Sequence, residues 1–447
     1  MDDPVRRLRD ALPADAIEPG VAEAVDALGG GRGAGMPPGV PPLAVVRPDS
    51  TAQVAQIVRI AAATGTPVVP YGGGTGLMGG ARAVEPAIVI DLERLNRVRT
   101  LEREWAWVEA GAVLAEVNRA LEPQGRMLGH DPWTVGIATV GGAISTNGLG
   151  FFGGKYGSMG EQVLALEAVL ADGTVLATRP AAPRSTGIDL TRLFVAAEGT
   201  LGVITAAALR TFAVPESSVR RGFRFATFEA GFAALEEMHR IGLAPAILDY
   251  GERGGAWEAQ APTLYAGFIG VREEVDGQLR RLVDVCREAT PIDQAEVDAF
   301  WAERHVPAER FARRRSSGSP DAGRCFDYVH VALPMSGVLR YRERARALAP
   351  AHGVDVVETG LWVHPGLFSM VMISEGADCA GRMASYVDAC LRLAIAAGGS
   401  MEYCHGVGVR LAHLMREQHG AGLDVMRAIK RALDPQGILN PGKLDLA

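Results

Sequence analysis

The stretch Tyr71-Gly72-Gly73-Gly74-Thr75-Gly76-Leu77-Met78-Gly79-Gly80 decides how the N-terminal half of this chain folds. It contains the pattern GxGxxG, but a Rossmann loop of that pattern must open directly into a helix whose N-terminus holds a pyrophosphate. Here residues 81–86 follow, and then the apolar run 87–92, which is typical of a buried strand. No Lys-Ser or Lys-Thr pair follows the glycines. The sequence therefore excludes both a Rossmann loop and a P-loop.

The glycines of this first loop favour anion binding. Residues without a Cβ atom free the backbone angle φ, so successive N–H groups can converge on one anion. The alternative is a flexible linker, but linkers rarely lie tightly between two apolar strands, as this stretch does between 68–70 and 87–92.

A second stretch, Asp131 to Gly148, repeats this chemistry. Small residues and the hydroxyl groups of Thr134, Thr139, Ser145 and Thr146 recur along it. Backbone N–H groups and hydroxyls are suitable partners for a polar cofactor. Two such loops in one domain suit a dinucleotide with a pyrophosphate and a ribityl chain.

Secondary-structure signals around the loops predict a mixed fold. Ser50 is placed to cap a helix with an apolar face that ends at Gly65. The pair Asp172-Gly173, between two apolar runs, predicts a hairpin. Beyond Pro215 the glycine-rich loops stop, and helical stretches alternate with short strands. We expect helices over 228–241, 382–396 and 423–433, a loose segment with a short helix over 1–37, and a long loop over 131–157.

Composition excludes several classes of protein. The net charge is −7 and no basic block is present, so we expect no nucleic-acid partner, and Arg313-Arg314-Arg315 reads as a solvated loop. No run approaches the roughly 18 apolar residues of a membrane span. The five cysteines, Cys286, Cys325, Cys379, Cys390 and Cys404, have irregular spacing. We therefore expect no disulfide framework and a cytoplasmic protein.

Several motifs stand together in one order along the chain. They are the loop Gly72 to Gly80, Ala138-Thr139-Val140-Gly141-Gly142, Lys155-Tyr156-Gly157, Glu198-Gly199-Thr200-Leu201-Gly202-Val203-Ile204-Thr205, and Asp434-Pro435 through Asn440-Pro441-Gly442-Lys443. In this order the chain resembles the FAD-binding oxidoreductases of the vanillyl-alcohol oxidase type, which have the PCMH fold. The resemblance covers residues 38–216 and the C-terminal tail.

The resemblance implies an α+β protein that binds FAD. It implies an N-terminal segment (1–37), an FAD-binding domain (38–216), a substrate or cap domain (217–405) and a C-terminal segment (406–447) that completes the FAD-binding domain. The residues expected to hold FAD are Tyr71, Gly72, Gly73, Gly74, Thr75, Gly76, Leu77, Gly79, Asp131, Thr139, Gly141, Gly142, Ser145, Thr146, Gly148, Tyr156, Glu198, Gly199, Gly202, Val203, Ile204 and Asn440. The first loop offers no His or Cys to link a flavin, so we expect non-covalent FAD.

Two branches of the family compete. One contains the D-lactate and glycolate dehydrogenases, and the other contains alkyldihydroxyacetonephosphate synthase, which uses FAD without net redox change. The metal ligands of the first branch align with Leu361, Phe368 and Cys404, so we expect no metal. His364 with Glu402 or His405 could form only a degenerate site. The synthase's essential Arg also falls at Leu361, which disfavours that activity.

The expected function is FAD-dependent oxidation of an alcohol or a 2-hydroxyacid. The alternatives are a non-redox enzyme of the synthase kind and a flavin-binding protein without activity. His405, in Cys404-His405-Gly406-Val407-Gly408, is the candidate base, because the glycines after it permit close approach to the flavin. Tyr403 could donate a hydrogen bond or act as a phenolate. The expected partners are a small-molecule substrate and, as an option, a second copy of the chain.

Some further side chains have two interpretations. His330, Trp362 and His130 could line the site, but packing roles are equally compatible with the sequence. A carboxylate substrate would need an Arg clamp, and the candidates Arg253, Arg314 and Arg410 cannot be ranked.

Overall fold

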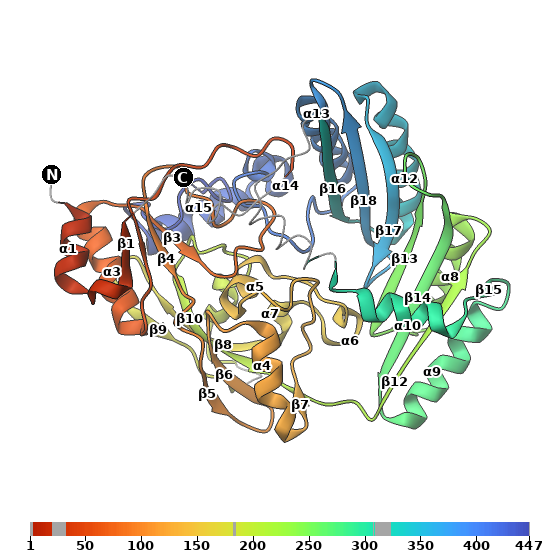
Figure 1. The fold of residues 1–447 in the computed structure, drawn as a ribbon, viewed down its shortest axis with the longest axis horizontal. Helices are drawn as coiled ribbons and strands as arrows, with labels where there is room; N and C mark the ends of the chain where they lie inside the picture. The colour runs from red at the N-terminus through yellow and green to blue at the C-terminus, as the bar shows by residue number, and fades with distance from the viewer. Residues whose placement is uncertain (1–2, 20–32, 182–184, 307, 309–322, 447) are drawn as a thin grey trace.

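The protein consists of two domains that lie side by side (Figure 1). The computed structural model describes residues 3–19, 33–181, 185–306, 308 and 323–446. The chain passes from the first domain to the cap domain between β11 (Phe212–Ala213) and β12 (Ser217–Arg224), and from Val407 onward it contacts the first domain again. In the described part of the chain, no helix is long and apolar enough to cross a membrane.

The first domain begins with a small sheet. Its strands lie in the order β1 (Ile17–Pro19), β2 (Ala44–Val46), β4 (Ile88–Asp91) and β3 (Val68–Tyr71), with the last three parallel. Helix α3 (Thr51–Thr64) joins β2 to β3 and has the expected ends. The Ser50 hydroxyl accepts the N–H of Gln53, and Gly65 has φ of 63°.

The N-terminal segment is more ordered than expected in its described part. Helix α1 (Pro4–Ala11) packs on α3 through the fully buried Leu8, and β1 pairs with β2. The expectation of a loose segment is therefore wrong for residues 3–19, because the apolar face of this short helix is covered. Residues 20–32 lie outside the described residues.

A second, antiparallel sheet completes the first domain. Its strands lie in the order β5 (Val98–Leu101), β6 (Trp105–Glu109), β10 (Val203–Arg210), β8 (Val163–Val169) and β9 (Val175–Ala177). The hairpin β8–β9 turns at Asp172-Gly173, as expected. The C-terminal tail follows α15 (Gly422–Leu433) and returns to the first sheet, where Val68 donates its N–H to the Ile438 carbonyl.

The cap domain contains a seven-stranded antiparallel sheet. The strand order is β15 (Thr290–Pro291), β12, β14 (Gln260–Gly270), β13 (Ile247–Arg253), β17 (Asp355–Trp362), β18 (Leu367–Glu375) and β16 (Arg324–Ala332). The helices that pack on one face are α8 (Phe228–Arg240), α9 (Arg272–Val285), α12 (Val338–Leu348) and α13 (Cys379–Ala396). Side chains alternate between the faces, so Val329 and Val331 of β16 enter this core while Tyr328 and His330 point to the other face. That other face is turned toward the first domain.

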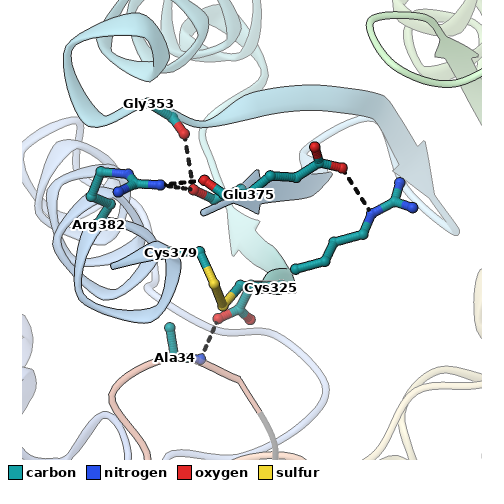
Figure 2. Close-up of a disulfide and its surroundings, with 9 residues drawn as sticks. Ala34, Cys325, Gly353, Glu375, Cys379 and Arg382 are labelled. Carbon is teal, nitrogen blue, oxygen red and sulfur yellow. Dashed lines mark hydrogen bonds and ion pairs between the residues drawn. A yellow bond between two sulfur atoms is a disulfide. The ribbon is translucent and has the colours of Figure 1, made fainter. Parts of the chain in front are cut away.

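The cap domain also contains a disulfide between Cys325 of β16 and Cys379 at the start of α13 (Figure 2). The Cα atoms are 5.7 Å apart, within the usual range for a disulfide. The structure therefore contains a disulfide that the count and spacing of the cysteines did not predict, although they argued only against a disulfide framework. Tertiary packing of α13 on β16 brings together two residues whose spacing in the sequence carries no signal.

The half-buried His330 gives the fold a testable pH dependence. Burial, and then the neighbouring His405, lower the pKa of His330 to about 3. In the unfolded chain this residue binds a proton below about pH 6.5. Between about pH 6.5 and pH 3 the unfolded chain therefore binds more protons than the folded chain. Stability should therefore fall as the pH drops from 6.5 toward 3. Melting temperatures at pH 7.5 and 5.0 should differ less in His330→Gln than in the wild type. An equal difference would show that His330 is not held neutral.

Candidate active site

The first loop leaves β3 and packs directly against the second glycine-rich stretch. A Cβ atom on Gly72 would collide with the Thr139 hydroxyl, and one on Gly73 would collide with the Ile137 carbonyl. Gly76 differs, because a Cβ atom there would meet no described protein atom within 4 Å. The packing of the protein therefore explains Gly72 and Gly73, whereas Gly76 leaves room above the loop for a bound group.

The second stretch is not the continuous loop that was expected. It contains the short helix α5 (Val140–Thr146), and the rest of the expected loop contains α6 (Gly153–Tyr156), with α7 (Met159–Gln162) just after it. Thr139 caps α5 by accepting the Gly142 N–H, and Asn147 ends it in the left-handed conformation. Glycine and hydroxyl residues were read as loop formers, but here they supply the cap and the close contact of Gly141 with Ala110.

Glu198 joins segments that are far apart in the sequence. Its carboxylate accepts the N–H groups of Val407 (2.6 Å) and Gly408 (2.9 Å). The Asn440 amide donates to the carbonyls of Gly80 (2.8 Å) and Glu198 (2.5 Å). The first loop, the 198–199 turn, the start of the C-terminal segment and the tail thus meet at one point. Burial raises the pKa of Glu198 to about 7, although the two backbone hydrogen bonds oppose that shift.

Several other residues expected at the cofactor have packing roles. Gly79, Gly199 and Gly202 make close contacts with Val409, Pro70 and Phe194, respectively. Val203 and Ile204 are buried in β10 and pair with β8.

Two expected side chains are turned toward other partners. The Asp131 carboxylate contacts Arg304 (3.0 Å) and His305 (3.1 Å) of the cap domain. The Tyr156 ring lies on Phe212, with 4.0 Å between ring centroids. Asp131 therefore links the two domains.

The remaining residues that are expected to hold FAD lie within the two glycine-rich stretches. Tyr71 is buried at the end of β3, and Gly74 follows with φ of 61°. Those that keep partial or full exposure are Thr75, Leu77, Gly142, Ser145, Thr146 and Gly148. They are available to a ligand that lies along both stretches.

The turn at residues 402–405 carries the candidate base. Oε1 of Glu402 accepts the N–H groups of Tyr403 (2.9 Å), Cys404 (2.9 Å) and His405 (3.1 Å). The same oxygen lies 3.3 Å from His405 Nδ1. Burial opposes ionisation of Glu402, but His405, His330 and the backbone donors outweigh it and lower its pKa to about 2. The sequence interpretation assigned Glu402 no role beyond a degenerate metal site, and an acid three residues before His405 was the available signal.

Polar side chains of the cap sheet converge on this turn. The centroid of the His405 ring lies 4.6 Å from that of His330 and 5.6 Å from that of Tyr328. The ring centroids of His330 and Tyr403 are 5.5 Å apart. Four buried atoms on this side have no hydrogen-bond partner among the described residues, namely Tyr328 OH, His330 Nδ1, Trp362 Nε1 and Tyr403 OH. Burying such groups without a partner is costly, so they fit a site built for a polar ligand.

The expected metal positions are not ligands. Leu361 and Phe368 pair across β17 and β18 and point into the apolar core. Burial raises the pKa of the Cys404 thiol well above its ordinary value. His364 packs against His239, with 5.2 Å between ring centroids, and does not join Glu402.

One group within the described residues has metal-like spacing. The ligand atoms of His330, Glu402 and His405 lie within 4.8 Å of one another. However, Oε1 of Glu402 already accepts three backbone N–H groups and contacts His405. The same geometry is explained without a metal as a carboxylate that holds a turn and an imidazole.

Two of the candidate arginine clamps have other partners. Arg410 forms a buried ion pair of 2.5 Å with Asp327, and Arg253 pairs with Glu358 at 2.6 Å. Arg314 lies outside the described residues. The carboxylate of Asp249, which lies on the same face of the sheet as Trp362, was missed, and burial raises its pKa to about 7.

Known proteins are similar to this chain over most of its length. A probable mitochondrial D-lactate dehydrogenase of Danio rerio is 30% identical over 90% of this chain and 84% of its own length. Glycolate oxidase subunit GlcD of Bacillus subtilis is 28% identical over 90% and 89%. Among solved structures, an alkyldihydroxyacetonephosphate synthase has a TM-score of 0.77 at 20% identity, covering 98% of this chain and 84% of that chain. A substrate-bound p-cresol methylhydroxylase has a TM-score of 0.79 at 18% identity, covering 99% and 96%.

The similarity to these two solved structures establishes the expected PCMH-type fold. The family described as FAD binding domain matches residues 42–179. The family described as FAD linked oxidases, C-terminal domain, matches residues 214–444. FAD is therefore the cofactor of this α+β protein, and the chain belongs to the FAD-linked oxidases.

Proposed function

We propose that this FAD-dependent oxidoreductase oxidises a small 2-hydroxyacid or a related alcohol, with His405 as the base. The proposal rests on one short segment, residues 402–408, which contains both the candidate base and a contact with the first loop. Residues 402–405 bear the polar cluster, and Gly406 and Gly408 follow at once. A Cβ atom on Gly408 would collide with the Met78 carbonyl of the first loop. The base is thus three residues from a contact with the cofactor loop.

The relatives support the choice of substrate class. Two that align over 90% of this chain are named as a D-lactate dehydrogenase and a glycolate oxidase subunit. Both names refer to 2-hydroxyacids. The cytoplasmic location and a homodimer remain predictions.

The side chains divide the chemical work as follows. Bound FAD supplies the acceptor for the hydride that leaves the substrate carbon. Nε2 of His405 takes the proton of the substrate hydroxyl. Burial raises the pKa of Tyr403 well above its ordinary value, so its hydroxyl stays protonated and is available to donate a hydrogen bond to the substrate. The phenolate role is therefore disfavoured, and the neutral His330 adds a further hydrogen-bonding group.

FAD should be held without a covalent bond, because the first loop contains no nucleophilic His or Cys. Acid precipitation of the purified yellow protein should release about one flavin per chain into the supernatant. Absorbance at flavin wavelengths that remains in the pellet would contradict this prediction.

Replacing Gly76 should remove FAD without unfolding the protein. Its Cβ position is open to the side where a ligand would lie, so Gly76→Leu should fold but lose at least half of its bound flavin. Flavin absorbance per chain and the circular dichroism spectrum measure the two effects. Gly254→Leu, at an equally open position in the cap domain, is the control. Full flavin content in Gly76→Leu would show that FAD does not lie over this residue.

Removing the base should slow the chemistry and leave cofactor binding intact. His405→Ala should reduce flavin with D-lactate or glycolate roughly 10²–10⁴-fold more slowly in anaerobic stopped-flow experiments. The acidic limb of the rate profile should disappear, and flavin content should not change. His364→Ala, which alters a histidine that packs against His239, is the control. A wild-type rate in His405→Ala would refute its role. Flavin that no hydroxyacid or alcohol reduces would favour a non-redox or inactive protein.

A further inference from the structure

We propose that Glu402 is the positioning residue for His405, holding Nδ1–H so that Nε2 faces the substrate. This inference rests on the proposed function, in which His405 is the base. It concerns a residue that does not itself reach the reacting atoms.

The geometry of the turn makes Glu402 a fixed point. Its side chain is 5% exposed, whereas that of His405 is 23% exposed. Three successive backbone N–H groups bind Oε1, so this oxygen cannot move without breaking the turn. The His405 ring reaches the same oxygen through Nδ1. Oε1 of Glu402, which orients the His405 ring, is therefore held in place by the backbone of residues 403–405, the segment that contains His405 itself.

The other groups around His405 do not provide an anionic partner of this kind. His330 and Tyr328 approach from β16, and burial disfavours the charged form of each. On its own turn, Cys404 Sγ lies 3.4 Å from Nδ1 and 3.6 Å from Nε2 of His405, but burial keeps the thiol neutral, so it is not an anionic partner. Glu198 lies beyond Gly406, where it accepts the N–H groups of Val407 and Gly408. Of these neighbours, Glu402 is the carboxylate in contact with the ring.

Two consequences follow for the base. A proton on Nδ1 leaves the lone pair on Nε2, because the hydrogen bond made by one ring nitrogen decides which nitrogen is protonated. When Nε2 takes the proton of the substrate hydroxyl, the ring becomes positively charged and the carboxylate stabilises that charge without accepting the proton. In other enzymes, a catalytic histidine is likewise oriented by a hydrogen bond to a neighbouring group.

The tautomer can be measured without turnover. Long-range ¹H–¹⁵N correlation spectra of the FAD-bound protein, labelled with ¹⁵N-histidine, report which ring nitrogen carries the proton, and His405→Ala identifies the signal. We expect the wild-type His405 signal to show Nδ1–H above the pH at which the ring is protonated. In Glu402→Ala, which removes the acceptor of Nδ1–H, this tautomer should no longer dominate, whereas Glu402→Gln, whose amide oxygen can still accept the backbone N–H groups and Nδ1–H, should retain it. Glu358→Gln should leave the signal unchanged. Nδ1–H that dominates equally in a folded, FAD-bound Glu402→Ala would overturn the proposal.

Kinetics provide the second arm. Glu402→Gln should slow flavin reduction roughly 10- to 10³-fold and move the acidic limb of the rate profile to lower pH, with flavin content unchanged. The double variant Glu402→Gln/His405→Ala should be no slower than His405→Ala alone, because Glu402 acts through His405. Additive losses would show that Glu402 has a separate, structural role and would overturn the proposal.

The outcomes separate the two proposals. A wild-type rate in His405→Ala refutes the base itself. A slow His405→Ala with a wild-type rate in Glu402→Gln refutes only the positioning role. Stoichiometric zinc or manganese in the purified protein, lost together with activity on chelation, would make Glu402 a ligand and would also overturn it.

Discussion

The position of Glu198 is the constraint on which the rest of this structure depends. The residue adopts a left-handed backbone with φ of 49°, which costs free energy for any residue other than glycine. In return its carboxylate receives two N–H groups of the C-terminal segment, and its carbonyl receives the amide of Asn440. Gly80 and Gly406 lack side chains where that carboxylate lies. One buried acid thus fixes how the start of the C-terminal segment, the first loop and the tail meet.

From that junction the alternation of a β-sheet sets the chemistry of the cap domain. Each strand sends every second side chain into the core under the four helices, and the others face the first domain. On β16 this rule places Val329 and Val331 in the core and Tyr328 and His330 at the site. The same rule sends Leu361 and Phe368 into the core, where a metal ion has no ligands. A substitution along these strands therefore acts on packing if its side chain lies on the face covered by the helices, and on the reaction if it lies on the face toward the first domain.

Local signals made much of the fold predictable from sequence. The cap at Ser50, the stop at Gly65 and the turn at Asp172-Gly173 depend on neighbouring residues only, and each appears as expected. The two glycine-rich stretches were recognised, but not that Thr139 and Asn147 turn part of the second into a helix. The contacts of Glu402 are local, and its spacing of three residues from His405 was an available signal, whereas the role of His330 and the disulfide of Cys325 depend on contacts between distant segments. Neither a spacing nor a propensity encodes such contacts in one sequence.

The collisions that side chains at Gly72 and Gly73 would cause have a thermodynamic consequence. These residues are glycines because the first loop lies flat on the Ile137 carbonyl and the Thr139 hydroxyl, and those contacts involve no ligand. The loop is therefore preorganised, and little backbone entropy remains to be lost when the dinucleotide arrives. A loop that becomes ordered only on binding would subtract that entropy from the affinity. Tight retention of FAD would then rest on rigidity already present in the apoprotein as much as on the contacts the cofactor makes.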